Sequence, residues 1–144
     1  MHLSELRGRR VVSRSSAETL GEVSDVLLSP ATLGAWSVSA LVLGKGRKAQ
    51  SVGWPQIVGV GPDAVVVTDD DAASEQHDRS PMGRLALSEL GNAAGLVTDV
   101  EFDETTGALI SLATETVLIE GDRLLADGPY ALIVAAREGA EFPG

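Results

Sequence analysis

The sequence contains no cysteine, which excludes disulfide bonds, thiolate-bound metals and a cysteine nucleophile. Histidine is almost as scarce, with His2 near the N-terminus and His77 in a polar stretch. Neither position offers the buried, oriented imidazole of a Ser-His-Asp triad, and the two are not at the spacing of a zinc site. We therefore expect no metal, no cofactor and no enzymatic activity.

Long hydrophobic runs are also missing. No segment approaches the roughly 20 apolar residues that a membrane-spanning helix requires. The N-terminus, MHLSELRGRR, has no apolar run behind its charges and so does not resemble a signal peptide. We expect a soluble, cytoplasmic protein. Aromatic residues make up only 3% of the chain, whereas 44% is hydrophobic, so the core should consist of Val, Leu, Ile and Ala.

The net charge of −10 is unevenly distributed. Residues 1–60 contain seven Lys and Arg against four acids, a net charge of +3, and residues 61–144 contain four against seventeen, a net charge of −13. An acidic half of this size repels nucleic acid, because phosphate contacts dominate that affinity. We therefore expect no direct DNA binding.

The chain repeats itself. GPDAVVV at 61–67 returns as GPYALIV at 128–134, an offset of 67 residues. Gly21-Glu-Val-Ser-Asp-Val26 returns as Gly95-Leu-Val-Thr-Asp-Val100 at an offset of 74, which also aligns Arg10 with Arg84. The second copy therefore lacks seven residues, which we place at the loop 44–48 (GKGRK).

Short β-branched runs opened by Gly-Pro turns, with no long helical periodicity, predict an all-β protein. We expect two small β-barrels, at residues 1–70 and 80–136, packed as a pseudo-symmetric pair. An acidic linker should join them at 69–81, and 137–144 should form a tail. Copies this small lie near the lower size limit for an independent core, so they should bury a face against each other.

The repeated Gly-x-Val-x-Asp-Val element breaks the alternation of a regular strand. Val23 and Val26 lie three residues apart, as do Val97 and Val100, so a strict period of two would place them on opposite faces. Either these strands are buried on both faces, or a β-bulge redirects one of the side chains.

The order of these motifs resembles the PRC-barrel domain. The elements that carry the resemblance are an N-terminal Leu-x-Gly start, the Gly-x-Val-x-Asp-Val strand, a turn ending in glycine, a Trp-Pro element and a closing valine strand. In this sequence its principal residues are Gly21, Val23, Asp25, Val26, Trp54 and Pro55 in the first copy, and Gly95, Val97, Asp99 and Val100 in the second.

The family includes a barrel of the photosynthetic reaction-centre H subunit and the C-terminal barrel of the ribosome-maturation factor RimM. The resemblance implies a small barrel that docks onto other macromolecules and supplies no catalytic residues. Because the N-terminal membrane helix of the former and the separate N-terminal barrel of the latter have no counterpart here, neither specific function is carried over. We expect a stand-alone tandem protein, of bacterial source.

The candidate docking loop contains Lys45, Arg47 and Lys48, with glycines at 44 and 46, and the second copy has no equivalent cations. No helix follows it, so it is not a phosphate-binding loop. Either it is a solvated turn, or it contacts an acidic protein surface, RNA or anionic lipid. Trp36 is an interface anchor if it is exposed, and Trp54 should plug or cover the barrel.

The leading hypothesis is a non-catalytic adaptor that binds a protein or ribonucleoprotein assembly, with a homo-oligomer also open. The alternative is a small-ligand-binding β-barrel, which the scarcity of aromatic residues disfavours. An acid–base enzyme would require Asp25 and Asp99 to share one cleft. We expect both carboxylates to be structural, bonded to nearby backbone or to an arginine such as Arg10 or Arg84.

Overall fold

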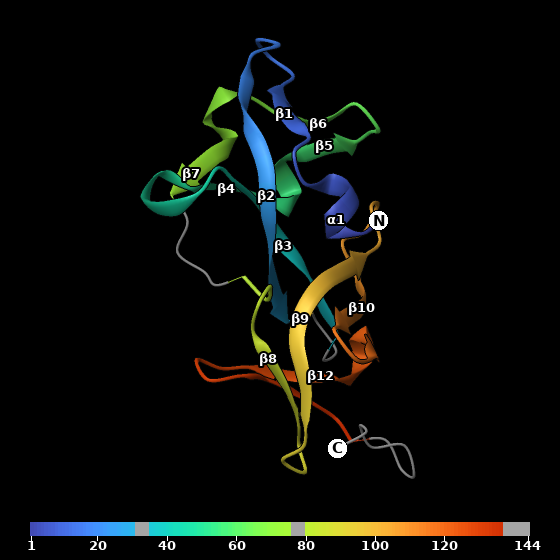
Figure 1. The fold of residues 1–144 in the computed structure, drawn as a ribbon. Coiled ribbons are helices and arrows are strands. Elements are labelled where there is room, and N and C mark those ends of the chain that lie inside the picture. The colour runs from blue at the N-terminus through green and yellow to red at the C-terminus, as the bar shows by residue number, and fades with distance from the viewer. Residues whose placement is uncertain (31–34, 76–79, 137–144) are drawn as a thin grey trace.

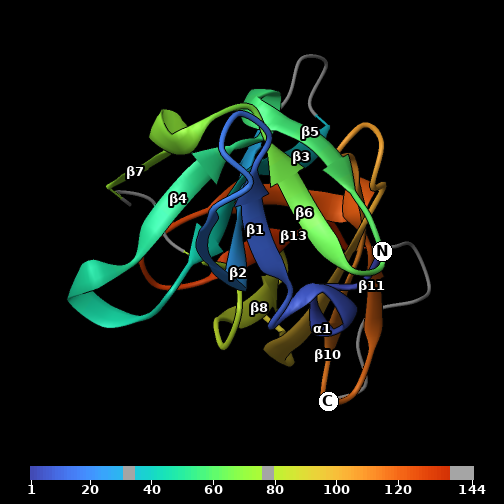
Figure 2. The ribbon, with the colours of Figure 1, turned by 90° about the horizontal axis from the view of Figure 1, so that it is seen from above.

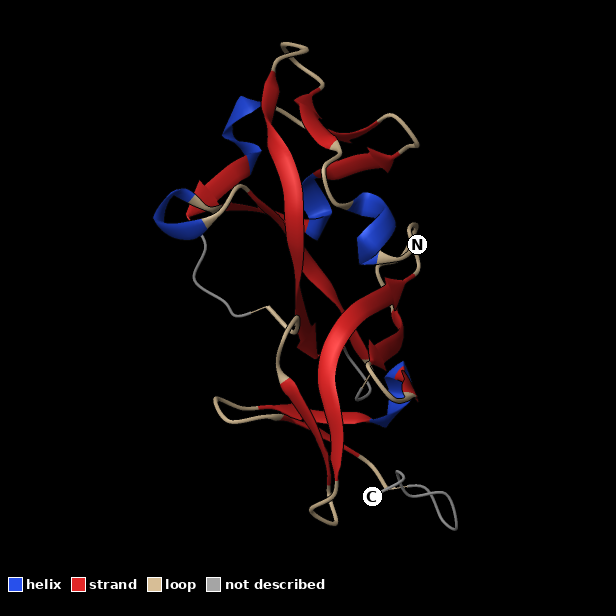
Figure 3. Cartoon of the chain, viewed as in Figure 1, coloured by secondary structure: helices blue, strands red, loops and turns tan. Residues whose placement is uncertain are grey.

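A computed structural model describes residues 1–30, 35–75 and 80–136. The chain forms two β-sheets with one short helix and several 3-10 turns, which confirms the all-β prediction (Figures 1 and 3). The sheets define two units, the first from β1 to β7 and the second from β8 to β13.

The elements of the first unit are α1 (Leu3–Leu6), β1 (Arg10–Ser13), β2 (Thr19–Pro30), β3 (Trp36–Leu43), η2 (Gly46–Lys48), β4 (Gln50–Gly53), η3 (Trp54–Gln56), β5 (Ile57–Val60), β6 (Ala64–Val67), η4 (Asp70–Ala72) and β7 (Ala73–Glu75). Those of the second unit are β8 (Leu85–Ser88), β9 (Ala93–Phe102), β10 (Leu109–Thr114), β11 (Leu118–Glu120), η5 (Gly121–Arg123), β12 (Leu124–Asp127) and β13 (Leu132–Val134).

The two sheets share one topology. The first has the order β5-β6-β1-β2-β3-β4-β7 and the second the order β12-β13-β8-β9-β10-β11. In each, the first and last strands of the repeat pair in parallel, β1 with β6 and β8 with β13. Neither sheet closes on itself through backbone pairing. The units are therefore barrel-like, and strand β7 is an addition that the second unit lacks among its described residues.

A β-bulge explains the broken alternation of the repeated strand. The register shifts between Val23 and Asp25 on β2, and between Val97 and Asp99 on β9. The extra residue turns both valines of each element inward, so Val23, Val26, Val97 and Val100 are all at most 2% exposed. Of the two interpretations that the sequence left open, the bulge is the one observed.

The strand registers show where the copies differ in length. Leu41 and Leu112 occupy equivalent positions, and so do Val52 and Ile119, because they pair across equivalent strands. The offset between the copies falls from 74 at β2 to 71 at β3 and 67 at β4. Four of the seven missing residues therefore lie in the predicted β3–β4 loop, and three lie in the connection before it.

The predicted alignment of Arg10 with Arg84 is wrong by one residue. The backbone N–H of Val23 bonds the carbonyl of Arg9, and that of Val97 bonds the carbonyl of Arg84. Arg9, and not Arg10, is thus the equivalent of Arg84, because the β8–β9 turn is one residue shorter than the β1–β2 turn. Each arginine donates to a glycine carbonyl, Arg9 to Gly61 and Arg84 to Gly128.

The structure also differs from the sequence prediction at the connection between the units. The predicted linker 69–81 begins with η4 and β7, and β7 pairs with β4 as the edge strand of the first sheet. In the second unit, β11 pairs with β10 and β12 pairs with β13, with η5 between them. The predicted tail, 137–144, lies outside the described residues.

The larger of two hydrophobic clusters among the described residues joins the units. It contains side chains from both sheets and from α1, whose Leu3 and Leu6 are fully buried. The Trp54 ring of the first unit meets the Phe102 ring of the second edge-on, with centroids 6.0 Å apart. Figure 1 shows the first unit above the second, and Figure 2 looks down on the first unit. This shared core agrees with the expectation that each copy covers a face of the other.

Candidate functional site

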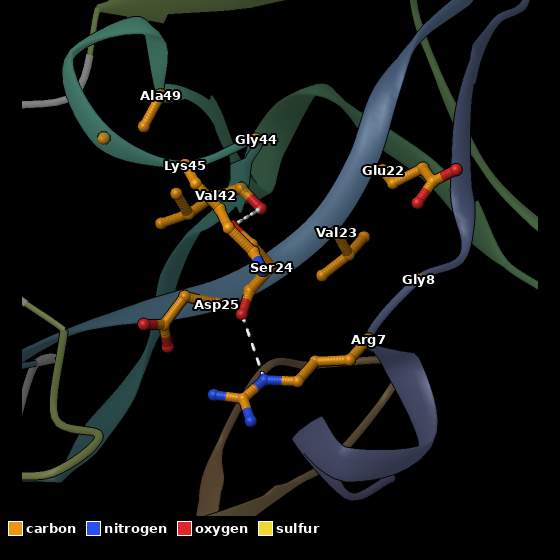
Figure 4. Close-up of a pocket in the computed structure, with 11 residues that line it drawn as sticks. Arg7, Gly8, Glu22, Val23, Ser24, Asp25, Val42, Gly44, Lys45 and Ala49 are labelled. Carbon is orange, nitrogen blue, oxygen red and sulfur yellow. Dashed lines mark hydrogen bonds between the residues drawn. The ribbon is translucent and has the colours of Figure 1, made fainter.

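A groove with a volume of about 670 Å³ lies on the first unit. The α1–β1 turn, the bulged part of β2, the end of β3 and the β3–β4 loop surround it (Figure 4). Val23 and Val42 contribute apolar surface, and four charged side chains line it: Arg7, Glu22, Asp25 and Lys45. The groove is open and mixed in charge, which suits a segment of a macromolecule.

The β3–β4 loop forms one wall of this groove. Residues 44–48 are all exposed, as the sequence predicts for a docking loop. Glycines at 44 and 46 have φ of +75° and +67°, a conformation that favours glycine and lets the chain turn sharply into η2. Lys45 lines the groove, whereas Arg47 and Lys48 lie in η2 beyond it. The loop therefore presents three cations beside a groove.

Arg7 borders the same groove. Its Nε donates a hydrogen bond to the carbonyl of Ser24 at 3.1 Å, which fixes the guanidinium beside β2 (Figure 4). Its two terminal nitrogens bond no described residue, so they remain available to an incoming acceptor. Sequence reasoning missed Arg7 and Glu22 because only the packing of the α1–β1 turn against β2 brings them to the loop.

The equivalent aspartates Asp25 and Asp99 have different surroundings. Each accepts a hydrogen bond from the next backbone N–H, at 2.8 Å in both cases. Asp99 also accepts bonds from the backbone N–H and the hydroxyl of Ser4, at 3.1 and 2.7 Å. Asp25 lines the groove and Asp99 does not, and neither bonds an arginine among the described residues.

These contacts lower the pKa of the Asp99 carboxyl. Partial burial raises its pKa, but the bonds from Ser4 and Val100, together with the nearby His2, outweigh burial and hold the pKa below its ordinary value. The His2 ring lies between two carboxylates, with Nδ1 at 3.6 Å from Asp99 Oδ2 and Nε2 at 3.7 Å from Glu101 Oε2. Asp99 therefore fastens the N-terminal segment to the second unit.

The two tryptophans are not interface anchors on the surface. Trp36 is 8% exposed and belongs to the core, so the exposure that a docking role required is not met. Trp54 is half-buried and contacts Phe102 and Gly107 of the second unit. A Cβ on Gly107 would lie 3.0 Å from the Trp54 ring, and its φ is +80°, so glycine is required there. Trp54 thus covers the junction between the units.

A comparison with models of protein families shows the family to which the chain belongs. The model of the PRC-barrel domain matches residues 1–73, just over half of the chain. The chain belongs to the PRC-barrel family. A comparison with curated proteins found no match. No described helix is both long and apolar enough to cross a membrane.

The residues that carry the PRC-barrel resemblance have structural surroundings. Gly21 and Gly95 begin the bulged stretch, and a Cβ on Gly21 would lie 3.3 Å from Leu43. The four valines fill the core. The Trp-Pro element, Trp54 and Pro55, forms η3, and Gly121–Arg123 forms the equivalent turn η5 in the second unit. Among the family-motif residues of the first unit, Asp25 is the polar one that reaches the groove.

Proposed function

We propose that this PRC-barrel protein is a non-catalytic adaptor of the cytoplasm that docks onto a protein or ribonucleoprotein assembly. The supporting observation is the exposed β3–β4 loop with its three cations, which borders the groove of the first unit. Cations on an exposed loop steer an acidic partner and fix its orientation. The acidic second half keeps the protein away from free nucleic acid.

The alternative, a small ligand held inside a barrel, has less support. Fully buried side chains such as Val11, Val65, Phe102 and Leu132 fill the space within the sheets. The grooves found on the described residues are open to solvent, and each has at least one charged side chain in its lining. They therefore lack the enclosed, mostly apolar lining of a metabolite pocket.

The test is capture of partners from lysate of the source organism with the purified full-length chain. The variant Lys45→Glu/Arg47→Glu/Lys48→Glu should lose a partner that the natural chain retains at low salt. The retained partner should also weaken as salt rises, because the Debye length shortens to about 8 Å at physiological ionic strength. A partner that is captured equally by both proteins would contradict the role of the loop.

A matched pair of single variants controls for net charge. Arg47→Glu and Arg14→Glu each reverse one exposed arginine of the first unit, but Arg14 follows strand β1 and lies outside the β3–β4 loop. Arg47→Glu should weaken capture, whereas Arg14→Glu should leave it close to that of the natural chain. Equal losses would show that the effect is general electrostatics and not docking.

A further inference from the structure

The second unit shows how its aspartate captures a helical turn. Ser4 lies in the first turn of α1 and directs both its backbone N–H and its hydroxyl to Asp99. The first backbone N–H groups of a helical turn lack partners within the turn, so a carboxylate can accept their hydrogen bonds. Leu3 and Leu6 of the same turn are fully buried.

The first unit presents the same acceptor without an occupant. Asp25 is the equivalent of Asp99 on the equivalent bulge, and it makes the same 2.8 Å bond to the following N–H. No other described residue donates a hydrogen bond to its carboxylate. Figure 4 shows the carboxylate of Asp25 at the edge of the groove, with no hydrogen bond drawn to it from the labelled residues. The acceptor that binds α1 in one unit is therefore open in the other.

The open site also has two cations that its counterpart lacks. Arg7 precedes Gly8 as Met82 precedes Gly83, and both glycines donate their N–H to the equivalent valine carbonyls. Arg7 thus corresponds to a neutral methionine. Lys45 belongs to the loop that is four residues shorter in the second unit. The Asp25 site therefore combines a helix-capping carboxylate with two groups that bind acids. Glu22, which stands where the second unit has Leu96, adds a further anion to the groove lining.

Helix N-termini have the chemistry that matches this combination. Their free N–H groups suit Asp25, and acidic residues are favoured in the first turn, where they suit Arg7 and Lys45. Resting on the proposed docking function, we infer that the groove binds the N-terminal turn of a helix of the partner protein. Asp25 caps that turn, and Arg7 and Lys45 pair with its acidic residues.

The test uses a defined probe and the full-length chain labelled with ¹⁵N. The probe is a synthetic helical peptide that begins Leu-Ser-Glu-Glu and continues in alanine and glutamine. On titration, the amide signals of residues 24–26 and 44–49 should shift. Asp25→Asn should weaken binding about tenfold, as expected for loss of a charge-assisted hydrogen bond. Arg7→Gln/Lys45→Gln should weaken it by a similar factor, and a peptide with both glutamates changed to glutamine should bind less tightly.

The control is Asp63→Asn, which removes an exposed acid of the same unit outside the groove and should leave the affinity unchanged. The inference is overturned if Asp25→Asn and Asp63→Asn bind the peptide equally, or if the shifts fall elsewhere. Thermal unfolding of each variant identifies any that lose the fold, and the Arg7/Lys45 variant then decides. A partner lost with the loop reversal but retained by Asp25→Asn would leave docking intact and refute the helix-cap mode alone.

Discussion

The two units have the same internal plan and different surfaces. Strand order, the bulge and the inward residues are repeated, down to the arginine that bonds a glycine carbonyl in each unit. Outward positions differ. The charged cross-strand pair Arg10–Glu22 of the first unit is replaced by Leu85–Leu96 in the second. The three loop cations have no counterpart at all.

This difference separates what the fold requires from what a partner requires. An inward side chain is constrained by its neighbours in a close-packed core, so most inward positions are apolar in both copies. An outward side chain contributes little to stability and is free to follow function. The cationic loop and the open Asp25 therefore assign the proposed docking role to the first unit, while the second unit shares its core.

The largest loss of stability should follow truncation of the equivalent leucines on the central strands β3 and β10. Leu41 and Leu112 are both fully buried. Leu41→Ala and Leu112→Ala should each lower the free energy of unfolding by about 3 kcal/mol. Because the units share a core, each variant should unfold in one transition, measured by calorimetry and circular dichroism. Two separate transitions would contradict the shared core.

The equivalent 3-10 turns η3 and η5 begin with different residues, a tryptophan in the first unit and a glycine in the second. Gly121 is the equivalent of Trp54, and a Cβ there would lie 2.4 Å from the backbone oxygen of Leu109. Gly121→Ala should therefore destabilise the protein by about 2 kcal/mol, through overpacking against rigid backbone. Gly128→Ala is the control, since its nearest contact is an ordinary 3.7 Å. Chemical denaturation that ranks the two variants equally would refute this packing.

The equivalent aspartates should differ in their effect on stability. Asp99→Asn removes the charge that accepts two bonds from Ser4, and should cost about 1 kcal/mol, because the side chain is only 23% exposed. Asp25→Asn should change stability by less than about 0.5 kcal/mol, because the asparagine oxygen still accepts the bond from Val26. Urea denaturation at pH 7 measures both, and equal effects would show that Ser4 does not stabilise the junction.

The free energy of unfolding should depend on pH through Asp99. The pKa of Asp99 is lower in the folded chain than the ordinary 3.8, so its contribution is complete at neutral pH. That contribution is lost as the pH falls below about 4 and through the folded pKa. Asp99→Asn should reduce the loss of stability on acidification, measured as the difference in free energy of unfolding between pH 7 and pH 3.

The smallest effect on stability should come from replacing the outward-facing Leu85–Leu96 pair by the charged pair of the first unit. Leu85→Arg/Leu96→Glu gives the second unit the pair that the first unit carries at the same register. Leu96 is 46% exposed, so the free energy of unfolding should change by less than about 0.5 kcal/mol. A loss above 1 kcal/mol in denaturation experiments would show that this outer face is packed and not solvated.

The fold was largely predictable because the sequence repeats it. Gly-Pro turns and β-branched runs mark the strands, and the paired bulges are visible as a three-residue spacing between Val23 and Val26. Strand β7 was not predictable, since three polar and small residues show no period. The burial of Trp36 was also hidden, because it depends on packing with residues distant in the sequence.

The candidate site was predictable only in part. The loop cations stand out because the second copy lacks them. Arg7, Glu22 and Asp25 do not, since they are separated in the sequence and meet Lys45 only when the α1–β1 turn packs beside β2. The difference between Asp25 and Asp99 depends on Ser4, 95 residues from Asp99, and no local pattern reveals that contact.

The most direct test of the docking account gives the first unit the shorter β10–β11 turn of the second unit in place of its β3–β4 loop. Residues 44–49 are replaced by the shorter turn of the second unit, Glu115–Thr116, and partner capture from lysate is compared with that of the natural chain. The account predicts that the variant melts within a few degrees of the natural chain and captures no partner. A folded variant that captures the partner undiminished would contradict the claim that the first unit docks through its β3–β4 loop.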